Sequence, residues 1–162
     1  MRVWKTAFWN VTGSSERLCL FESFVASELR KSELRERVLK KIGDDEIHIE
    51  PQEKSKFLVL ENGQDRFCLK PDVVGYEKED KDLKPVFIAD TKWKILNDDS
   101  KNYGISQNDM YQMFAYLTKY ECEQGFLIYP EIANNDSKSK IFTFEYNSKT
   151  ALAICFFPLQ DK

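Results

Sequence analysis

The order of the hydrophobic periodicities is the feature that most restricts how this chain can fold. A helical pattern starts near Thr12 and predicts a helix to about Ile42. A second helix is predicted from Ser106, with Asp109 in a capping-box position, to about Tyr120. Alternating segments predict strands at 46–50, 57–60, 66–76, 85–96, 124–129, 140–146 and 151–159. This order of elements, in which each helix is followed by strands, indicates an α/β fold with a mixed β-sheet flanked by helices. It excludes all-α and all-β proteins.

Composition excludes several classes of protein. The net charge of −3 is too small and of the wrong sign for binding nucleic acid through overall positive charge. No apolar segment approaches the roughly 20 residues that cross a bilayer, and no signal-peptide cleavage site follows the N-terminus. The four cysteines are far apart in the sequence, so we expect free, mostly buried thiols in a cytoplasmic protein. The only histidine, His48, is expected to face solvent from a strand.

The end of the predicted strand 85–96 is a candidate for chemistry. It reads Phe87-Ile88-Ala89-Asp90-Thr91-Lys92-Trp93-Lys94, so alternation places Asp90 and Lys92 on one face and Thr91 on the other. A carboxylate and an amine at the end of an apolar strand suit a metal site with a positive group beside it. An ion pair on an edge strand explains the same pattern, so Asp90-Thr91-Lys92 alone does not distinguish a metal site from a structural ion pair.

A second carboxylate lies upstream, in Leu69-Lys70-Pro71-Asp72. Proline inside a strand pattern marks an edge or a bulge, although Pro-Asp is also common in turns. If the strand of Asp72 pairs with that of Asp90, two carboxylates converge beside Lys92. Carboxylates, waters and substrate phosphate are how proteins usually hold Mg²⁺.

Two predicted helices carry polar residues that would face this region. Glu22 lies four residues after Leu18 and three before Val25, on the apolar side of the first helix, so its carboxylate is expected to face the sheet. Gln112 and Tyr116 are four residues apart and share a face of the second helix. They could orient the site or contact a phosphate, while a packing role is the alternative for Tyr116.

These residues together resemble the PD-(D/E)XK nuclease superfamily. The resemblance is carried by Glu22, Pro71-Asp72, Asp90-Thr91-Lys92 and Gln112-Met113-Phe114-Ala115-Tyr116. The longer segments Leu20-Phe21-Glu22-Ser23-Phe24-Val25 and Ser106-Gln107-Asn108-Asp109-Met110-Tyr111-Gln112 make it more specific. With them the chain is similar, over about residues 18–159, to McrC, the nuclease subunit of the modification-dependent McrBC restriction systems.

The resemblance implies a restriction-endonuclease-like core and Mg²⁺-dependent cleavage of DNA phosphodiester bonds, with Mn²⁺ able to replace Mg²⁺. It also implies partnership with a McrB-like AAA+ GTPase. Carried over, Asp72 and Asp90 ligate the metal together with Thr91. Lys92 positions the attacking water or steadies the developing charge; a nearby cation is expected to depress the pKa of Lys92.

The resemblance also assigns roles on the helices. Glu22 matches a helix carboxylate that supports the metal through water, and Gln112 and Tyr116 match a helical motif found in several branches of the superfamily. We expect one nuclease domain over 1–162, with 1–13 as a short lead-in and the N-terminal docking region of McrC absent. The alternatives are a junction resolvase, a RecB-type exonuclease, or a non-catalytic DNA-binding scaffold with the same fold.

Overall fold

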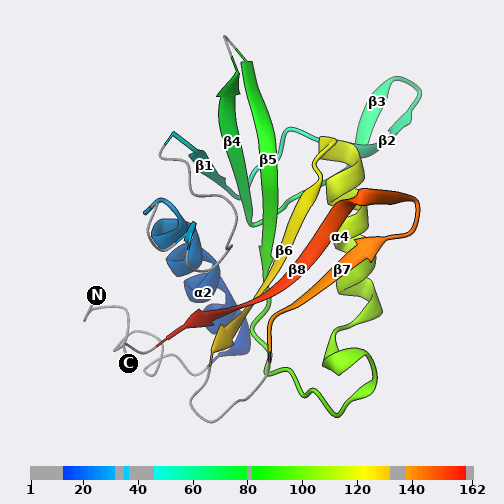
Figure 1. Ribbon diagram of the computed structural model, residues 1–162. Helices are drawn as coiled ribbons and strands as arrows, with labels where there is room; N and C mark the ends of the chain where they lie inside the picture. Colours follow the sequence, from blue (N-terminus) through cyan, green and yellow to red (C-terminus); the bar gives the residue numbers. More distant parts are fainter. Residues whose placement is uncertain (1–12, 32–34, 37–45, 80–81, 132–137, 160–162) are drawn as a thin grey trace.

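The computed structural model describes residues 13–31, 35–36, 46–79, 82–131 and 138–159. Its helices are α2 (Ser14–Leu29), α4 (Gln107–Tyr120) and the short 3-10 helix η1 (Lys101–Gly104). Its strands are β1 (His48–Pro51), β2 (Phe57–Glu61), β3 (Gln64–Cys68), β4 (Val73–Glu79), β5 (Asp82–Thr91), β6 (Gln124–Glu131), β7 (Lys140–Phe144) and β8 (Asn147–Pro158). This mixed sheet with flanking helices confirms the predicted α/β fold (Figure 1).

The main sheet has six strands in the order β1-β4-β5-β6-β8-β7. The pairs β1–β4, β4–β5 and β7–β8 are antiparallel, while β5–β6 and β6–β8 are parallel. Parallel neighbours need a crossover connection, and α4 provides the one between β5 and β6. The antiparallel pairing of β4 with β5 brings the start of β4 beside the end of β5, because Val73 pairs with Ala89.

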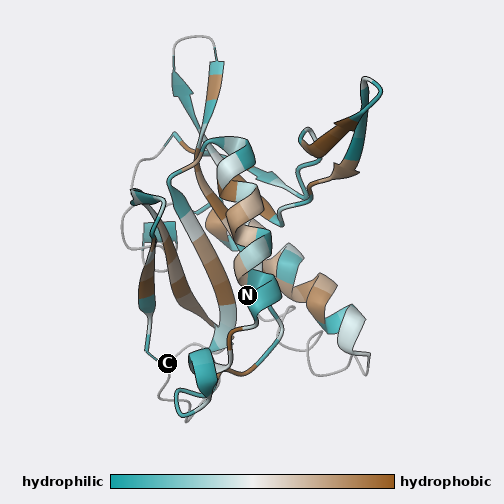
Figure 2. Ribbon diagram, turned by 90° about the vertical axis from the view of Figure 1, so that its right-hand side faces the viewer, coloured by the Kyte–Doolittle hydropathy of each residue, from teal (hydrophilic) through white to brown (hydrophobic). Residues whose placement is uncertain are grey.

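Alternation along the central strands divides the core between the two faces of the sheet. On β5, Phe87 and Ala89 pack in the cluster that includes α2, whereas Ile88 packs in the cluster that includes α4. The strands β6 and β8 alternate in the same way, and these central strands are mostly hydrophobic (Figure 2). The two helices therefore cover opposite faces, and a strand residue's position decides which helix it meets.

The first helix is shorter than predicted. It ends at Leu29 rather than near Ile42, although Arg35 and Glu36 are again helical; residues 37–45 lie outside the described part of the chain. The Arg35 side chain is only 1% exposed and its Nη1 donates to the carbonyl oxygen of Leu29 at 3.1 Å. A side chain six residues further along thus satisfies a carbonyl at the helix end that continued helix would otherwise have satisfied.

The predicted strand 66–76 is two strands, β3 and β4, separated by a segment containing Pro71. The predicted strand 85–96 runs instead from Asp82 to Thr91, and β4 continues to Glu79, which pairs with Asp82. Proline cannot donate to a ladder, and the Thr91 N–H donates to the Asp72 side chain instead of a strand backbone. The break in strand pairing before β4 and the end of β5 at Thr91 therefore lie side by side in the sheet.

The strands β2 and β3 form a separate hairpin, joined at Asn62-Gly63 as predicted, with φ of 50° and 78°. Left-handed values at both positions suit this dipeptide. The hairpin carries hydrophobic residues, drawn in brown in Figure 2, and their side chains are exposed, including Phe67 at 74%.

The second helix forms as predicted, and Ser106 Oγ accepts a hydrogen bond from the Asp109 N–H at 3.1 Å. Phe114 on this helix is 42% exposed and packs its ring against Phe144 and Tyr146, with centroids 5.8 and 5.2 Å away. The helix lies close to β6, because a Cβ on Gly125 would come within 2.9 Å of a Leu117 methyl group.

The cysteines described are all free, but only Cys122 and Cys155 are buried, fewer than expected; Cys68 is half-buried and Cys19 exposed. His48 is exposed on β1, as predicted. Among the described residues, every helix is too short or too polar to traverse a lipid bilayer.

We predict that Gly75→Ala destabilises the β4–β5 pairing. A Cβ on Gly75 would lie 2.1 Å from the ring of Phe87, which is fully buried and in edge contact with Phe126. Overpacking of this kind costs about 1–3 kcal/mol, which urea unfolding measures. In a Phe87→Ala background the same substitution should cost much less, and an equal cost in both backgrounds would contradict the steric explanation.

Candidate active site

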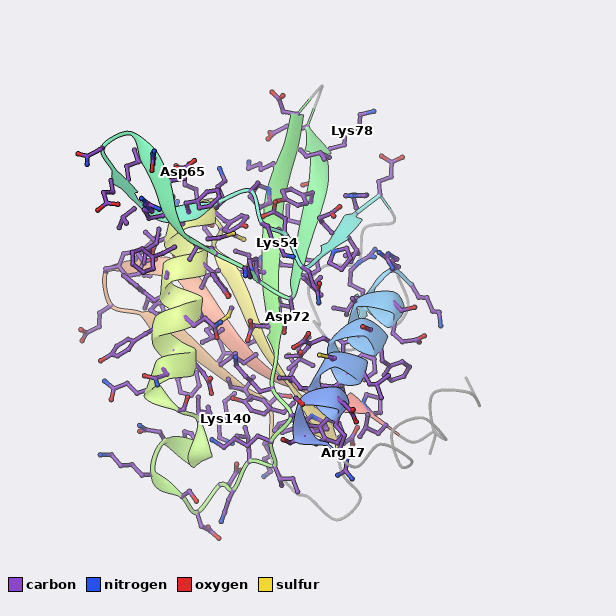
Figure 3. The ribbon with its side chains drawn as sticks, turned by 180° about the vertical axis from the view of Figure 1, so that it is seen from behind. Arg17, Lys54, Asp65, Asp72, Lys78 and Lys140 are labelled. Carbon is purple, nitrogen blue, oxygen red and sulfur yellow. The ribbon has the colours of Figure 1, made fainter. Side chains whose placement is uncertain are left out.

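Asp72 lies one residue before β4 and is fixed against the end of β5. Its Oδ2 accepts hydrogen bonds from the N–H of Thr91 at 2.7 Å and from Thr91 Oγ1 at 2.8 Å. Its backbone carbonyl accepts the N–H of Gln52 at 2.8 Å. Seen from behind, Asp72 lies in the region between α2 and α4 (Figure 3). Both hydrogen bonds of the side chain use one oxygen, and no described residue donates to Asp72 Oδ1.

Asp90 lies near the end of β5 and is 2% exposed. Its Oδ2 is 2.5 Å from Lys92 Nζ, an ion pair whose angles do not fit a hydrogen bond, and the oxygen has no hydrogen-bond partner among the described residues. Buried carboxylate oxygens are normally satisfied by donors or by a metal ion. A carboxylate held by one poorly aligned ion pair can accept a further ligand.

The carboxyl groups of Asp72, Asp90 and Glu22 act on one another electrostatically. Burial, and then repulsion from Asp72, raise the pKa of Asp90 to about 7, against the opposing effect of Lys92. Burial also raises the pKa of Asp72, although the Thr91 hydrogen bonds oppose this. Burial and then Asp72 raise the pKa of Glu22. Holding these three carboxylates ionised in one buried cluster therefore costs electrostatic free energy, which a bound cation would lower.

Lys92 is held as an ammonium. Burial lowers the pKa of Lys92, but the carboxylates of Asp90, Asp109 and Asp72 together outweigh burial, and the pKa is raised overall. The depression of this pKa expected beside a bound cation stays a prediction. The side chain projects toward α4, where its Nζ donates to Gln112 Oε1 at 2.9 Å and lies 3.6 Å from Asp109 Oδ1. Lys92 is a hydrogen-bond donor in this arrangement.

A chain of hydrogen bonds continues from Lys92 across α4. Gln112 Nε2 donates to Tyr116 Oη at 2.8 Å, and Tyr116 donates to the backbone carbonyl of Lys70 at 3.0 Å. This chain returns to the segment that leads into Asp72. The structure therefore brings together Asp72, Asp90, Thr91, Lys92, Gln112 and Tyr116, and Tyr116 combines burial with a polar contact.

Glu22 approaches from α2 and is half-buried. Burial and then Asp72 raise its pKa, while Lys92 and the side chain of Gln52 oppose that rise. Sequence reasoning missed Gln52, which carries a φ of 49° and donates its N–H to the Asp72 carbonyl, and nothing in its sequence context marks it. It also missed the contact of Asp109 with Lys92, although its spacing of three from Gln112 was a signal.

The side chains present fit a hard divalent cation. Among the described residues, no three His, Cys, Asp or Glu side chains gather closely enough to enclose a metal by themselves. Asp72, just before β4, and Asp90, on β5, offer carboxylate oxygens, and the backbone carbonyl of Thr91 is a further oxygen donor next to Asp90 in the chain. Mg²⁺ commonly binds one or two carboxylates and takes its remaining ligands from water and phosphate.

Comparison with solved structures supports the fold. The chain matches a protein chain in the "Refined half-complex from tetradecameric assembly of Thermococcus gammatolerans McrB AAA+ hexamers with bound McrC", with a TM-score of 0.52 and 17% sequence identity. The match covers 87% of this chain but only 27% of the other. No curated protein matches this chain.

The sequence also matches a protein family, the McrBC 5-methylcytosine restriction system component, over residues 19–130. This range covers most of the chain and includes Glu22, Asp72, Asp90, Lys92 and Gln112. The chain therefore belongs to the family of McrBC 5-methylcytosine restriction system components.

Proposed function

We propose that this chain is a Mg²⁺-dependent DNA endonuclease of the PD-(D/E)XK type that works in a McrBC-type restriction system. The observation that carries the proposal is the convergence of Asp72 and Asp90 at the β4–β5 pairing, with Lys92 Nζ 2.5 Å from Asp90. Membership of the McrBC family supports the biological setting. A non-catalytic scaffold would have no need to bury Asp90 at a raised pKa.

Each residue has a distinct part in the proposed reaction. Asp72 and Asp90 would hold the cation, with the Thr91 carbonyl as a further ligand and Glu22 supporting through water. A bound Mg²⁺ supplies polarisation of the scissile phosphate and makes water more acidic. Thr91 fixes the orientation of the Asp72 carboxylate through two hydrogen bonds.

Lys92 would act on the phosphate or on the attacking water. As an ammonium it donates hydrogen bonds, so it can orient a water or stabilise negative charge that develops on the phosphate oxygens. Gln112 restricts the Lys92 side chain, and Tyr116 fixes the Gln112 amide by donating onward to Lys70. The helical pair therefore holds the amine in position for either role.

We further propose a McrB-like AAA+ protein as the partner. The matched structure is an assembly of McrB AAA+ hexamers with bound McrC, and this chain spans 27% of the chain it matches there. Recognition of the modified base would then belong to the partner, and this chain would supply cleavage.

We predict that Asp90→Asn abolishes Mg²⁺-dependent cleavage, by about 1,000-fold or more, while the protein stays folded. The substitution removes a metal ligand but resembles the protonated carboxyl that the raised pKa favours. Asp65→Asn makes the same change at an exposed position of the β2–β3 hairpin and should cleave normally. Circular dichroism verifies folding, and unchanged cleavage by Asp90→Asn would exclude Asp90 from the reaction.

The substrates in this assay separate the alternatives. Supercoiled plasmid, linear duplex and a four-way junction are each incubated with Mg²⁺, with and without an AAA+ GTPase of the McrB type. Internal cleavage of plasmid supports the endonuclease. Digestion only from linear ends would indicate an exonuclease, and preference for the junction a resolvase.

We predict that metal binding weakens steeply below pH 7. Asp90, whose pKa is raised to about 7, must lose its proton to ligate a cation. At pH 5.5 about 3% of such a group is ionised, so Mn²⁺ affinity measured by calorimetry should be about thirtyfold lower than at pH 8. The Asp90→Asn variant should bind Mn²⁺ weakly at both pH values. Equal Mn²⁺ affinities of the wild-type protein at pH 5.5 and pH 8 would contradict this account.

A further inference from the structure

Tyr129 on β6 carries a polar atom that the fold leaves unexplained. The residue is 0% exposed, and its Oη has no hydrogen-bond partner among the described residues. Its ring packs in the core on the α4 side and contacts Phe156, with centroids 6.4 Å apart. A phenylalanine would fill that space without burying a hydroxyl, and buried hydroxyls in native proteins almost always bind a protein group or an ordered water.

The register of the sheet places Tyr129 beside Lys92. Thr91 pairs with Ile128 in the parallel β5–β6 ladder, and the Lys92 N–H donates to the Ile128 carbonyl at 2.9 Å. Lys92 follows Thr91 and Tyr129 follows Ile128, so Lys92 and Tyr129 are neighbours across the two strands. Both side chains lie on the α4 face, since Lys92 contacts Gln112 and Tyr129 belongs to the core under α4.

The Lys92 ammonium has an incomplete set of partners. Its Nζ forms an ion pair with Asp90 at 2.5 Å and donates a hydrogen bond to Gln112 at 2.9 Å, whereas Asp109 lies 3.6 Å away. The last distance exceeds a direct hydrogen bond, so Asp109 does not satisfy an N–H of the ammonium directly. Tyr129 lies in the same local field, because burial raises its pKa and Asp109, then Asp90, raise that pKa further.

We propose that Tyr129 and Asp109 hold an ordered water against the ammonium of Lys92, which makes Tyr129 a positioning residue of the site. The Tyr129 hydroxyl and the Asp109 carboxylate each gain a partner through this water, and Lys92 gains its third contact. The role in cleavage rests on the proposed nuclease function. When a cation occupies Asp90, Lys92 loses its closest partner, and the water and Gln112 keep the amine in place.

The water is tested in the metal-free full chain by NMR of lysine ammonium groups. The Lys92 signal is identified by its loss in Lys92→Arg. We expect Tyr129→Phe, which removes only the hydroxyl, to shift or broaden that signal. Tyr120→Phe is the matched control, because Tyr120 is also buried on the α4 side but its hydroxyl donates to Glu53. An unchanged signal in Tyr129→Phe, or an equal change in both variants, would overturn the proposal.

The positioning role is tested by steady-state cleavage kinetics. Loss of a residue that supports a site through water lowers activity by roughly tenfold. Tyr129→Phe should therefore lower kcat about tenfold while KM for DNA and the half-saturating Mg²⁺ concentration stay unchanged, and Tyr120→Phe should match the wild type. A wild-type kcat in Tyr129→Phe overturns the positioning role. If the wild-type chain cleaves no substrate, the nuclease proposal fails, whereas the NMR comparison still decides the water.

Discussion

The register between β4 and β5 positions everything else in the candidate site. Because Val73 pairs with Ala89, Asp72 meets the end of β5, where both the N–H and the hydroxyl of Thr91 bind its carboxylate. A shift of one residue would move Asp90 to the α2 face and separate it from the helix that holds Lys92. The neighbouring parallel register between β5 and β6 then places α4 against the same strand end.

This arrangement is electrostatically costly in the absence of a cation. Asp90 is buried, its pKa is raised to about 7, and Asp72 contributes to that rise. Lys92 offsets part of the cost through its ion pair but leaves Asp90 Oδ2 without a hydrogen bond among the described residues. Protein interiors seldom retain such groups for stability, and strongly perturbed carboxyls in one cluster are typical of functional sites. The same groups that destabilise the metal-free site are those suited to a divalent ion.

The sequence predicted the fold class and the helix α4, because these follow from local periodicity. Polar spacing and the family resemblance also pointed to the residues that the structure brings together, whose roles in a reaction stay predictions. It did not predict the end of α2, where the buried side chain of Arg35 binds the Leu29 carbonyl. The sequence also did not predict the contacts of Gln52 or the unpartnered hydroxyl of Tyr129. Such contacts are set by strand register and helix placement, which a single sequence does not specify.

The most direct test of this account is a crystal structure of the chain grown with Mn²⁺, whose anomalous scattering locates the ion. The account predicts an ion bound by oxygens of both Asp72 and Asp90, at about 2.0–2.3 Å, with Lys92 displaced from Asp90 but still bonded to Gln112. Mn²⁺ absent from this position, or bound by only one of the two carboxylates, would contradict it.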